Sequence, residues 1–547
     1  MTSSHSPSHK RDIAAFTAVL LGLTALVLFL SDGGVLFTRP FWVDEWLTVF
    51  VANRSSPSAV VGDLAAGADG GAPLLHLTFW TLRRLGVALD PWIVRALALS
   101  SVLLALVVVF TVLRRRFPFA AAVAGALAVG AHPLIVWHSY DGRFYGPWLL
   151  GASLVALGLA RRQEASGAAR TDGEVAAGSE VAMPRTRSRS GAVGLGIAAF
   201  LLCAIHPYGI VSLGLLVPGA LAAYRGQWRL GLRDAAPALA GLLAVALLAP
   251  IALGQRDAYT VPTWLGDFRL WQLTFLSREF WTGSVPLLAV ALATVSAVVH
   301  VARGGKRSID GIRAPARDAG VLALLGLALM PLALAVISLL GQPSMLQRYA
   351  IVTALAWAPL VAWACLIAGR WATGVACLAL VWLWFGVYVR ETNVKLAFER
   401  TVAREQHIYA QAQSTGLPVV VQSMHVLFSL IGSAPRASPA LFLTLPDSAF
   451  ASLWDDATPI GQANRGLVLE RDLARVHSAR WRFPRLVTPG ALDTAHRFLL
   501  IAPEARRPAG FSSIQDFAAK VFPHHRIKRL LPDLFLLERS AAGVSSD

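Results

Sequence analysis

The stretch HSYDGRFYGPWLL, residues 138–150, places an aspartate, an arginine and two tyrosines between long apolar runs. The run before it, 119–137, and the run that begins within it, 143–160, are close to the length that crosses a bilayer as a helix, about 20 residues. Ionisable residues in such a setting are costly, so they face a partner or a functional site. The stretch therefore predicts a polar cluster at one membrane boundary of a helical protein.

The rest of the chain extends this pattern, since 55% of its 547 residues are hydrophobic, 15% are charged and the mean hydropathy is +0.57. A window of about 19 residues identifies further runs of this kind, and the full set is 14–31, 93–113, 119–137, 143–160, 191–206, 208–224, 235–253, 284–302, 319–340, 350–369 and 371–389. No small-residue cleavage site follows the first run, so we expect it to be a retained helix. The expected fold class is mainly α, a polytopic membrane protein of about 11 transmembrane helices.

The net charge of +17 is explained by membrane topology, and no nucleic-acid partner is expected. Lys and Arg gather in loops that share one side, at 10–11, 114–116, 161–189, 225–233, 303–317 and 370. Those loops hold 20 such residues, whereas the short connections on the other side, at 138–143, 206–208 and 341–349, hold two. The positive-inside rule then predicts a cytoplasmic N-terminus, with 32–92 and everything after Arg390 on the outer face of the plasma membrane.

Two segments differ from the apolar body. The cytoplasmic loop 161–190 consists largely of Ala, Gly, Ser and Arg, so we expect it to be disordered. The tail contains short β-like runs, LPVVVQS, ALFLTL, RFLLIAP and LFLLERS, separated by stretches of helical length. We therefore expect a transmembrane domain over 1–389 and a small extracytoplasmic α/β domain over 390–547.

The long outer loop, 32–92, opens with the carboxylate pair Asp44 and Glu45, which lies between Trp42 and Trp46. Tryptophans are enriched at membrane–water boundaries, so a pair of solvated acids beside them is one explanation. The functional interpretation is a general base at the membrane surface, because a carboxylate within hydrogen-bond reach of a hydroxyl can take its proton during attack.

Polar residues of three other segments are expected on the same face. They are Asp141, Arg143 and Tyr145 in the opening stretch, His206 and Tyr208 in AIHPYGI, and Gln347, Arg348 and Tyr349 in GQPSMLQRYA. Each cluster alone is explained by polar side chains at helix ends, but all of them converge on one side of the membrane. Two arginines there suit a phosphate group, because guanidinium is planar, bidentate and permanently charged.

These motifs occur in the order found in a known superfamily. The acidic pair after the first helix, APL in the first loop, PWIVRALALSSVL, SYDGRFYGPWLLG, HPYGIVSLGLL and QRYAIVTALAW resemble the GT-C membrane glycosyltransferases. The resemblance is to the branch with protein O-mannosyltransferase-like and aminoarabinose-transferase-like enzymes, and it covers 14–370. The family's usual HPPL reads GAPL at 71–74, so its histidine is missing, and His76 is only a weak match.

By this resemblance, 1–389 is a GT-C catalytic domain that transfers a hexosyl or pentosyl unit from a polyprenyl phosphate to an acceptor hydroxyl. The acceptor belongs to a cell-envelope glycan, a glycolipid or a glycoprotein. The implied roles are a catalytic site at Asp44 and Glu45, with Asp44 as base, and a donor-phosphate site at Arg143, Arg348 and Tyr145. The further site candidates are Asp141, His76, His206, Tyr208 and Tyr349.

A single base predicts inversion at the anomeric carbon, since retention needs a second carboxylate as nucleophile. Neighbouring helical residues point about 100° apart, so Glu45 is expected to position the helix. No metal or other cofactor is assigned, because no spacing of acidic and histidine residues is diagnostic. The three cysteines fall inside apolar runs, where they predict neither a disulfide framework nor a thiolate metal site.

The alternative function is a transporter or flippase of a lipid-linked sugar. Such proteins place ionisable residues near the bilayer midplane and contain related halves. The expected spans lack mid-span charges and the chain has no visible internal repeat, so the sequence favours the enzyme. A receptor domain on a membrane anchor fits the sequence least well, because an anchor needs one helix and this chain has about eleven expected spans.

Overall fold

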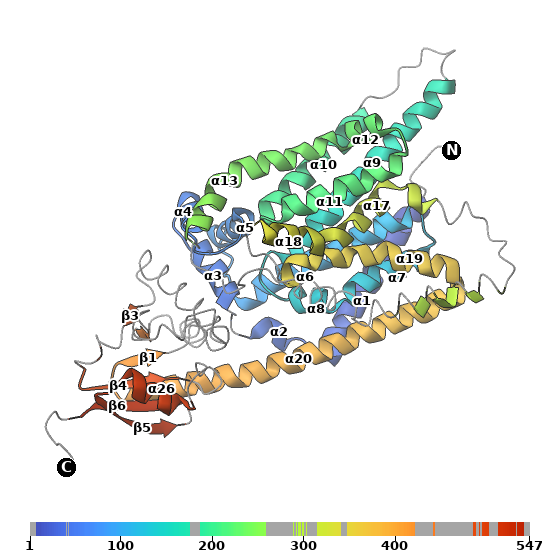
Figure 1. Ribbon diagram of the computed structural model, residues 1–547. Helices are drawn as coiled ribbons and strands as arrows, with labels where there is room; N and C mark the ends of the chain where they lie inside the picture. The colour runs from blue at the N-terminus through green and yellow to red at the C-terminus, as the bar shows by residue number, and fades with distance from the viewer. Residues whose placement is uncertain are drawn as a thin grey trace.

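The molecule is a bundle of apolar helices joined by one long helix to a small sheet at the C-terminal end (Figure 1). The computed structural model describes residues 7–39, 41, 43–175, 186–258, 314–340, 347–421, 441–443, 485–487, 495–502, 512–531 and 533–540, with separate positions between 288 and 302 and Leu492.

The helices of the bundle follow the apolar runs of the sequence closely. They are α1 (Pro7–Leu30), α6 (Pro91–Arg114), α7 (Phe119–Gly130), α8 (Pro133–Ser139), α9 (Tyr145–Val175), α10 (Thr186–Ile205), α11 (Gly209–Leu221), α12 (Trp228–Ala235), α13 (Ala240–Ala258), α17 (Ala319–Gly326), α18 (Met330–Leu339), α19 (Trp357–Ala368) and α20 (Arg370–Ser414). Short 3-10 segments connect them, namely η1 (Ala222–Tyr224), η2 (Ala236–Leu239), η3 (Pro315–Arg317), η4 (Leu327–Leu329) and η5 (Gln347–Ala356).

The helices identify a multi-pass membrane protein. In the described residues, six are long and apolar enough to cross a membrane, and a seventh span arises if α7 and α8, bent by 66°, are counted as one. Helices occupy ten of the eleven expected ranges, while 284–302 lies mostly outside the described residues. Two of the ten, at Ser190–Ile205 and Gly209–Tyr224, are apolar but short. Among the described residues, length and apolarity alone therefore give six or seven spans, and the expected span 284–302 stays a prediction.

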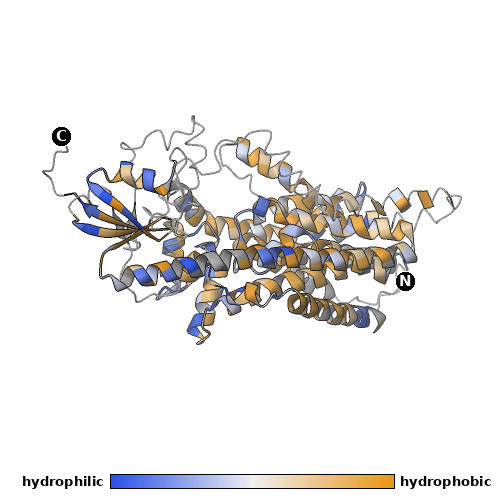
Figure 2. Ribbon diagram, turned by 90° about the horizontal axis from the view of Figure 1, so that it is seen from below, coloured by the Kyte–Doolittle hydropathy of each residue, from blue (hydrophilic) through white to orange (hydrophobic). Residues whose placement is uncertain are grey.

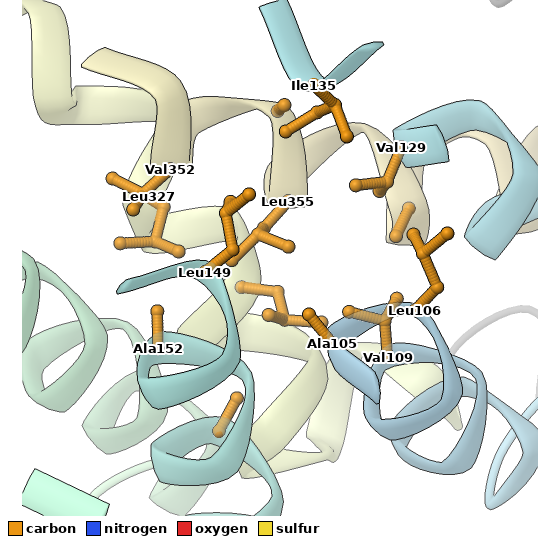
Figure 3. Packing of buried hydrophobic residues seen from close by; sticks show 14 of the residues in the cluster. Ala105, Leu106, Val109, Val129, Ile135, Leu149, Ala152, Leu327, Val352 and Leu355 are labelled. Atoms are coloured by element: carbon orange, nitrogen blue, oxygen red, sulfur yellow. The ribbon is translucent and has the colours of Figure 1, made fainter. Parts of the chain in front are cut away.

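The bundle core is made by small and branched apolar side chains from helices far apart in the sequence. Figure 3 shows side chains of α6, α7, α8, α9, η4 and η5 meeting in one cluster. Helices α6 and α9 approach closely because Gly146 has no side chain, and a Cβ there would lie 2.5 Å from the Ala98 carbonyl oxygen. Apolar residues dominate the bundle, whereas hydrophilic residues gather toward the C-terminal end (Figure 2).

Residues 32–92, expected as a loop, form four short helices. These are α2 (Val35–Thr38), α3 (Val43–Ala52), α4 (Pro57–Ala65) and α5 (Pro73–Arg84). The local sequence explains where α4 and α5 begin, since Pro57 and Pro73 stand at their first positions. The backbone N–H at a first helical position has no partner within the helix, so proline, which lacks this N–H, costs nothing there. The Ser56 hydroxyl caps α4 by accepting from Ala59 N at 3.1 Å. The segment is therefore a folded layer against the bundle.

The loop 161–190 was expected to be disordered, and for residues 161–175 and 186–190 this was wrong. Helix α9 continues to Val175 and α10 begins at Thr186, while 176–185 lie outside the described residues. Polar contacts hold the part of α9 that follows the apolar run 143–160. Ser166 Oγ donates to Asp234 at 2.7 Å, and Gln163 accepts from Ala319 N at 2.8 Å. Composition alone does not reveal such tertiary partners.

Helix α20 passes through residue 390, where the tail domain was expected to begin, without a break. Its second half is rich in Glu, Arg, Lys and Ala, which favour helix, and it ends before Gly416, whose φ is +68°. The helix thus leaves the bundle and reaches the C-terminal sheet as one unbroken element (Figure 1).

The tail forms a six-stranded mixed sheet in the order β3-β2-β1-β4-β6-β5. Its strands are β1 (Val419–Val421), β2 (Leu441–Leu443), β3 (Arg485–Val487), β4 (Arg497–Ile501), β5 (His525–Leu531) and β6 (Leu534–Arg539), with helix α26 (Ile514–Val521) beside them. The four runs expected to be β-like each contain a strand, β1, β2, β4 and β6, so the small α/β domain is confirmed. Strands β1 to β4 pair in parallel, whereas β6 pairs antiparallel with β4 and β5.

Candidate active site

The polar clusters of four separate segments meet at one end of the bundle. Arg348, at the start of η5, donates from Nη1 to Asp44 Oδ2 of α3 at 3.0 Å. Arg143, before α9, donates to the Asp44 carbonyl oxygen at 2.8 Å. The ring of His206, between α10 and α11, lies 5.7 Å from the ring of Tyr349 and 4.1 Å from that of Phe144. The tertiary fold thus joins segments up to 304 residues apart.

Asp44 and Arg348 form the accessible part of this site. Their side chains are 29% and 32% exposed. Both groups in such a pair keep access to water, so an incoming ligand can reach the carboxylate and the guanidinium directly. The remaining ionic groups around them are much less exposed.

Glu45, one residue further along α3, is held in a different environment. Its two carboxylate oxygens accept from Arg95 Nε at 2.8 Å and Arg95 Nη2 at 2.6 Å, and both side chains are almost fully buried. Gly142 N also donates to Glu45 at 2.8 Å, and this approach requires glycine because a Cβ there would collide with Val94. Burial raises the pKa of Glu45, but Arg95 outweighs it and leaves the pKa below its ordinary value.

Arg95 also ties the short helix α2 to the bundle. Its Nη1 donates to the carbonyl oxygens of Leu36 at 3.1 Å and Arg39 at 2.6 Å. The Glu45–Arg95 pair therefore docks α2 and α3 on α6, and the positioning role expected for Glu45 stays a prediction that this contact supports. Arg95 itself was not among the expected site residues, and its signal was a charged residue in the first turns of an apolar span.

Asp69, which sequence reasoning missed, organises the buried side of the site. Its carboxylate accepts hydrogen bonds from both terminal nitrogens of Arg143, at 2.5 Å and 2.9 Å, and from Thr48 Oγ1 at 3.1 Å. His76 Nε2 lies 2.9 Å from the same carboxylate. Burial raises the pKa of Asp69, but Arg143 and His76 more than offset it, and the pKa lies well below its ordinary value. The carboxylate is thus ionised throughout the neutral range.

This arrangement gives two expected site residues specific partners. Arg143 is a buried cation whose fork is occupied by Asp69, and His76 is buried with Asp69 on one nitrogen and the Ala72 carbonyl 3.2 Å from the other. The signal for Asp69 was present in ADGGAPLLH, where it precedes His76 by seven residues. Its importance depends on Arg143, 74 residues away.

Asp141 lies next to this network but has its own partners. Its Oδ2 is 2.8 Å from His138 Nδ1, and its Oδ1 is 3.6 Å from a guanidinium nitrogen of the buried Arg39. The His138 ring contacts that of Tyr145 at a tilt of 39°, with the ring centres 4.2 Å apart. Asp141 is therefore a second carboxylate near the site, engaged with a histidine and an arginine.

Aromatic rings form one wall of the site. Tyr208 and Tyr349 have ring centres 5.0 Å apart, and the buried His206 is stacked on Trp148 at 4.5 Å. Tyr145 is also buried, between His138 and Phe144. The expected candidates Tyr145, His206, Tyr208 and Tyr349 therefore belong to one cluster of ring contacts, which Phe144 links. Among the described residues, no group of three or more His, Cys, Asp or Glu side chains could hold a metal ion.

Fold and site together define a multi-pass helical membrane protein with a C-terminal α/β domain and a polar site where helix ends meet. No family model and no curated protein matches the chain. Among solved structures, the chain is similar to ArnT from Cupriavidus metallidurans in the apo state, with a TM-score of 0.57, 12% identity and coverage of 96% of this chain and 98% of that one.

A second structure of the same protein, ArnT bound to undecaprenyl phosphate, gives a TM-score of 0.54 and 14% identity over 97% of this chain and 98% of that one. At these identities the likeness shows the fold. The ArnT-like fold expected from the sequence resemblance is therefore confirmed over nearly the whole chain, including its C-terminal part.

Proposed function

We propose that the protein is a glycosyltransferase that moves a sugar from a polyprenyl phosphate to an acceptor hydroxyl at the membrane surface. The observation that carries this proposal is the accessible Asp44–Arg348 pair above a buried ionic layer. A carboxylate and a guanidinium side by side match the two needs of the reaction, a base for the acceptor and a cation for the donor phosphate. The fold likeness to a protein whose structure contains undecaprenyl phosphate supports the donor class.

In the proposed reaction, the Asp44 carboxylate removes the proton of the acceptor hydroxyl as its oxygen attacks the anomeric carbon. The bond from that carbon to the phosphate oxygen breaks, and polyprenyl phosphate leaves with the electron pair. Arg348 stabilises the negative charge that grows on the leaving phosphate, as fixed cations do in transition states.

Energetics distinguish the two neighbouring carboxylates. A partly exposed ion pair such as Asp44–Arg348 contributes only about 0.2–1 kcal/mol, so a phosphate can displace the carboxylate from Arg348. Breaking a buried pair such as Glu45–Arg95 costs about 3–5 kcal/mol. Asp44 is therefore the carboxylate free to act, and donor binding releases it from its own partner.

This exchange favours an inverting reaction in which donor binds before acceptor. Retention would need a second carboxylate to attack the anomeric carbon, and Glu45 is committed to Arg95 through both oxygens. Asp141 is engaged with His138 and Arg39. A single displacement, with Asp44 as the base, uses the groups that remain accessible.

The proposed function is tested by incubating the purified protein with a panel of polyprenyl-phosphate sugars. We expect a subset of donors to raise the thermal unfolding midpoint, and the same subset to support sugar transfer to envelope glycans, glycolipids or proteins. Transport of an intact lipid-linked sugar across vesicle membranes, without cleavage of the sugar–phosphate bond, would instead support the transporter alternative.

The two site arginines should respond differently to replacement by lysine. Arg348→Lys removes the planar fork at the accessible position, so we expect weaker donor binding in titrations with polyprenyl-phosphate sugar and an unchanged unfolding midpoint. Arg143→Lys weakens the buried pair with Asp69, so its main effect should be a lower unfolding midpoint. Equal donor affinity in Arg348→Lys and parent would remove Arg348 from the phosphate site.

The proposed orientation, with the C-terminal domain outside the cell, makes a labelling prediction. In a background with Cys203, Cys365 and Cys377 replaced by alanine, Ser540→Cys should react with an impermeant maleimide in intact cells. Gln227→Cys, in an exposed position between η1 and α12, should react only after permeabilisation. The reverse pattern would invert the topology.

A further inference from the structure

A cavity of about 340 Å³ lies away from the candidate active site, where the C-terminal ends of α3 and α5 meet. Its lining contains Asn53, Arg54, Ser55, Arg83 and Arg84. Small-molecule sites range from about 300 to 1,000 Å³, so this cavity, called here the arginine pocket, can hold a compact charged group.

The pocket is built by contacts that orient its arginines. Arg83 Nη1 donates to the Asn53 carbonyl oxygen at 2.6 Å, Arg84 Nη2 donates to that of Ser55, and Trp80 Nε1 donates to that of Arg54 at 3.1 Å. The turn after α3 is thus held by three donors from α5. Arg84 also lies over the Trp80 ring, 5.3 Å from its centre, so the ring gives its guanidinium a second contact.

The charge in the pocket is positive. Arg54 forms an ion pair with Asp63, whereas Arg83 and Arg84 have no carboxylate within 4.0 Å in the part of the chain that the structure describes. A guanidinium has five N–H donors, and each contact above uses one of them. Two adjacent arginines with donors to spare, on the wall of a cavity, match the bidentate geometry of a phosphate group.

The surroundings indicate that a membrane lipid presents this phosphate. Directly after the pocket, Leu85 is 75% exposed, and Trp92 is 55% exposed at the start of the membrane-spanning helix α6. Exposed apolar and tryptophan side chains beside arginines are typical of the headgroup level of a bilayer. The pocket therefore stands at the membrane boundary, about 13 Å along α3 from Asp44 at 1.5 Å per residue.

We propose that the arginine pocket binds the phosphate of an anionic phospholipid headgroup, as a site separate from Asp44 and Arg348. The bound lipid holds the folded layer 32–92 at the level of the lipid headgroups. Because α3 belongs to this layer, the lipid also sets the depth of its carboxylates in the membrane. This site does not depend on the proposed sugar transfer, since it is defined by the pocket and its charge alone.

The test measures lipid retention by the full-length protein in a non-ionic detergent. Native mass spectrometry with phosphatidylglycerol or phosphatidylcholine should show preferential retention of phosphatidylglycerol. We expect Arg83→Gln/Arg84→Gln to lower the affinity for phosphatidylglycerol about 30-fold, since each arginine near anionic lipid contributes on the order of 1 kcal/mol. Arg83→Lys/Arg84→Lys keeps the charge, so its affinity for phosphatidylglycerol should lie between that of the parent and that of Arg83→Gln/Arg84→Gln.

The matched control is Arg229→Gln/Arg370→Gln, which removes two exposed arginines that also lie over tryptophan rings. This variant should retain phosphatidylglycerol like the parent, and an equal loss in both double variants would overturn the proposal. So would unchanged retention in Arg83→Gln/Arg84→Gln with an unchanged unfolding midpoint. Saturation of the pocket by inorganic phosphate, with no gain from the lipid, would show a soluble anion site instead.

Discussion

The Asp44→Asn variant should bind donor at least as tightly as the parent and transfer sugar about 10²–10⁴ times more slowly, the usual contribution of a positioned base. Asparagine keeps the size and the hydrogen-bonding capacity of aspartate but removes its basicity. It also removes the carboxylate that competes with donor phosphate for Arg348. The loss should therefore appear in the turnover number measured under saturating donor, with no weakening in a donor titration.

The matched control for this experiment is Asp32→Asn, which removes an exposed carboxylate from the same folded layer and should leave the rate unchanged. Full activity of Asp44→Asn would show that the base lies elsewhere. Asp141 would then be tested next, because it is the other partly exposed carboxylate of the site.

The second large effect concerns stability at the Glu45–Arg95 pair. Removing one partner of a buried ion pair leaves an uncompensated charge, which costs about 3–5 kcal/mol. We expect Glu45→Gln and Arg95→Gln each to lower the unfolding midpoint strongly in detergent. Arg95→Gln should be the more severe, because Arg95 also holds the carbonyl oxygens of α2.

A double variant separates this stability effect from catalysis. Glu45→Leu/Arg95→Met replaces both charges by apolar groups of similar size, and such exchanges are often neutral for stability. The double variant should therefore recover much of the loss seen in either single variant. Single variants as stable as the parent would contradict the docking role of the pair, and a recovered double variant without activity would give the pair a role in the reaction.

The sequence was most informative about features that depend on local pattern. Apolar runs located helices at ten of the expected ranges, and the β-like runs located four strands of the tail sheet. The same reasoning failed where tertiary contacts decide. Residues 161–175 are helical, with Gln163 and Ser166 bonded to Ala319 and Asp234, and the layer 32–92 is folded against the bundle.

The site follows the same division. The sequence determined that acids, arginines and tyrosines stand at helix ends on one face, because such residues are rare in apolar chains and their order matches a known superfamily. It did not determine which acid is accessible, since Asp44 and Glu45 are neighbours with the same chemistry. Only the tertiary structure decided this, by burying Arg95 against Glu45 and leaving Arg348 at the surface beside Asp44. The importance of Asp69 likewise depends on Arg143, and a contact between residues far apart in the chain leaves no local pattern in sequence.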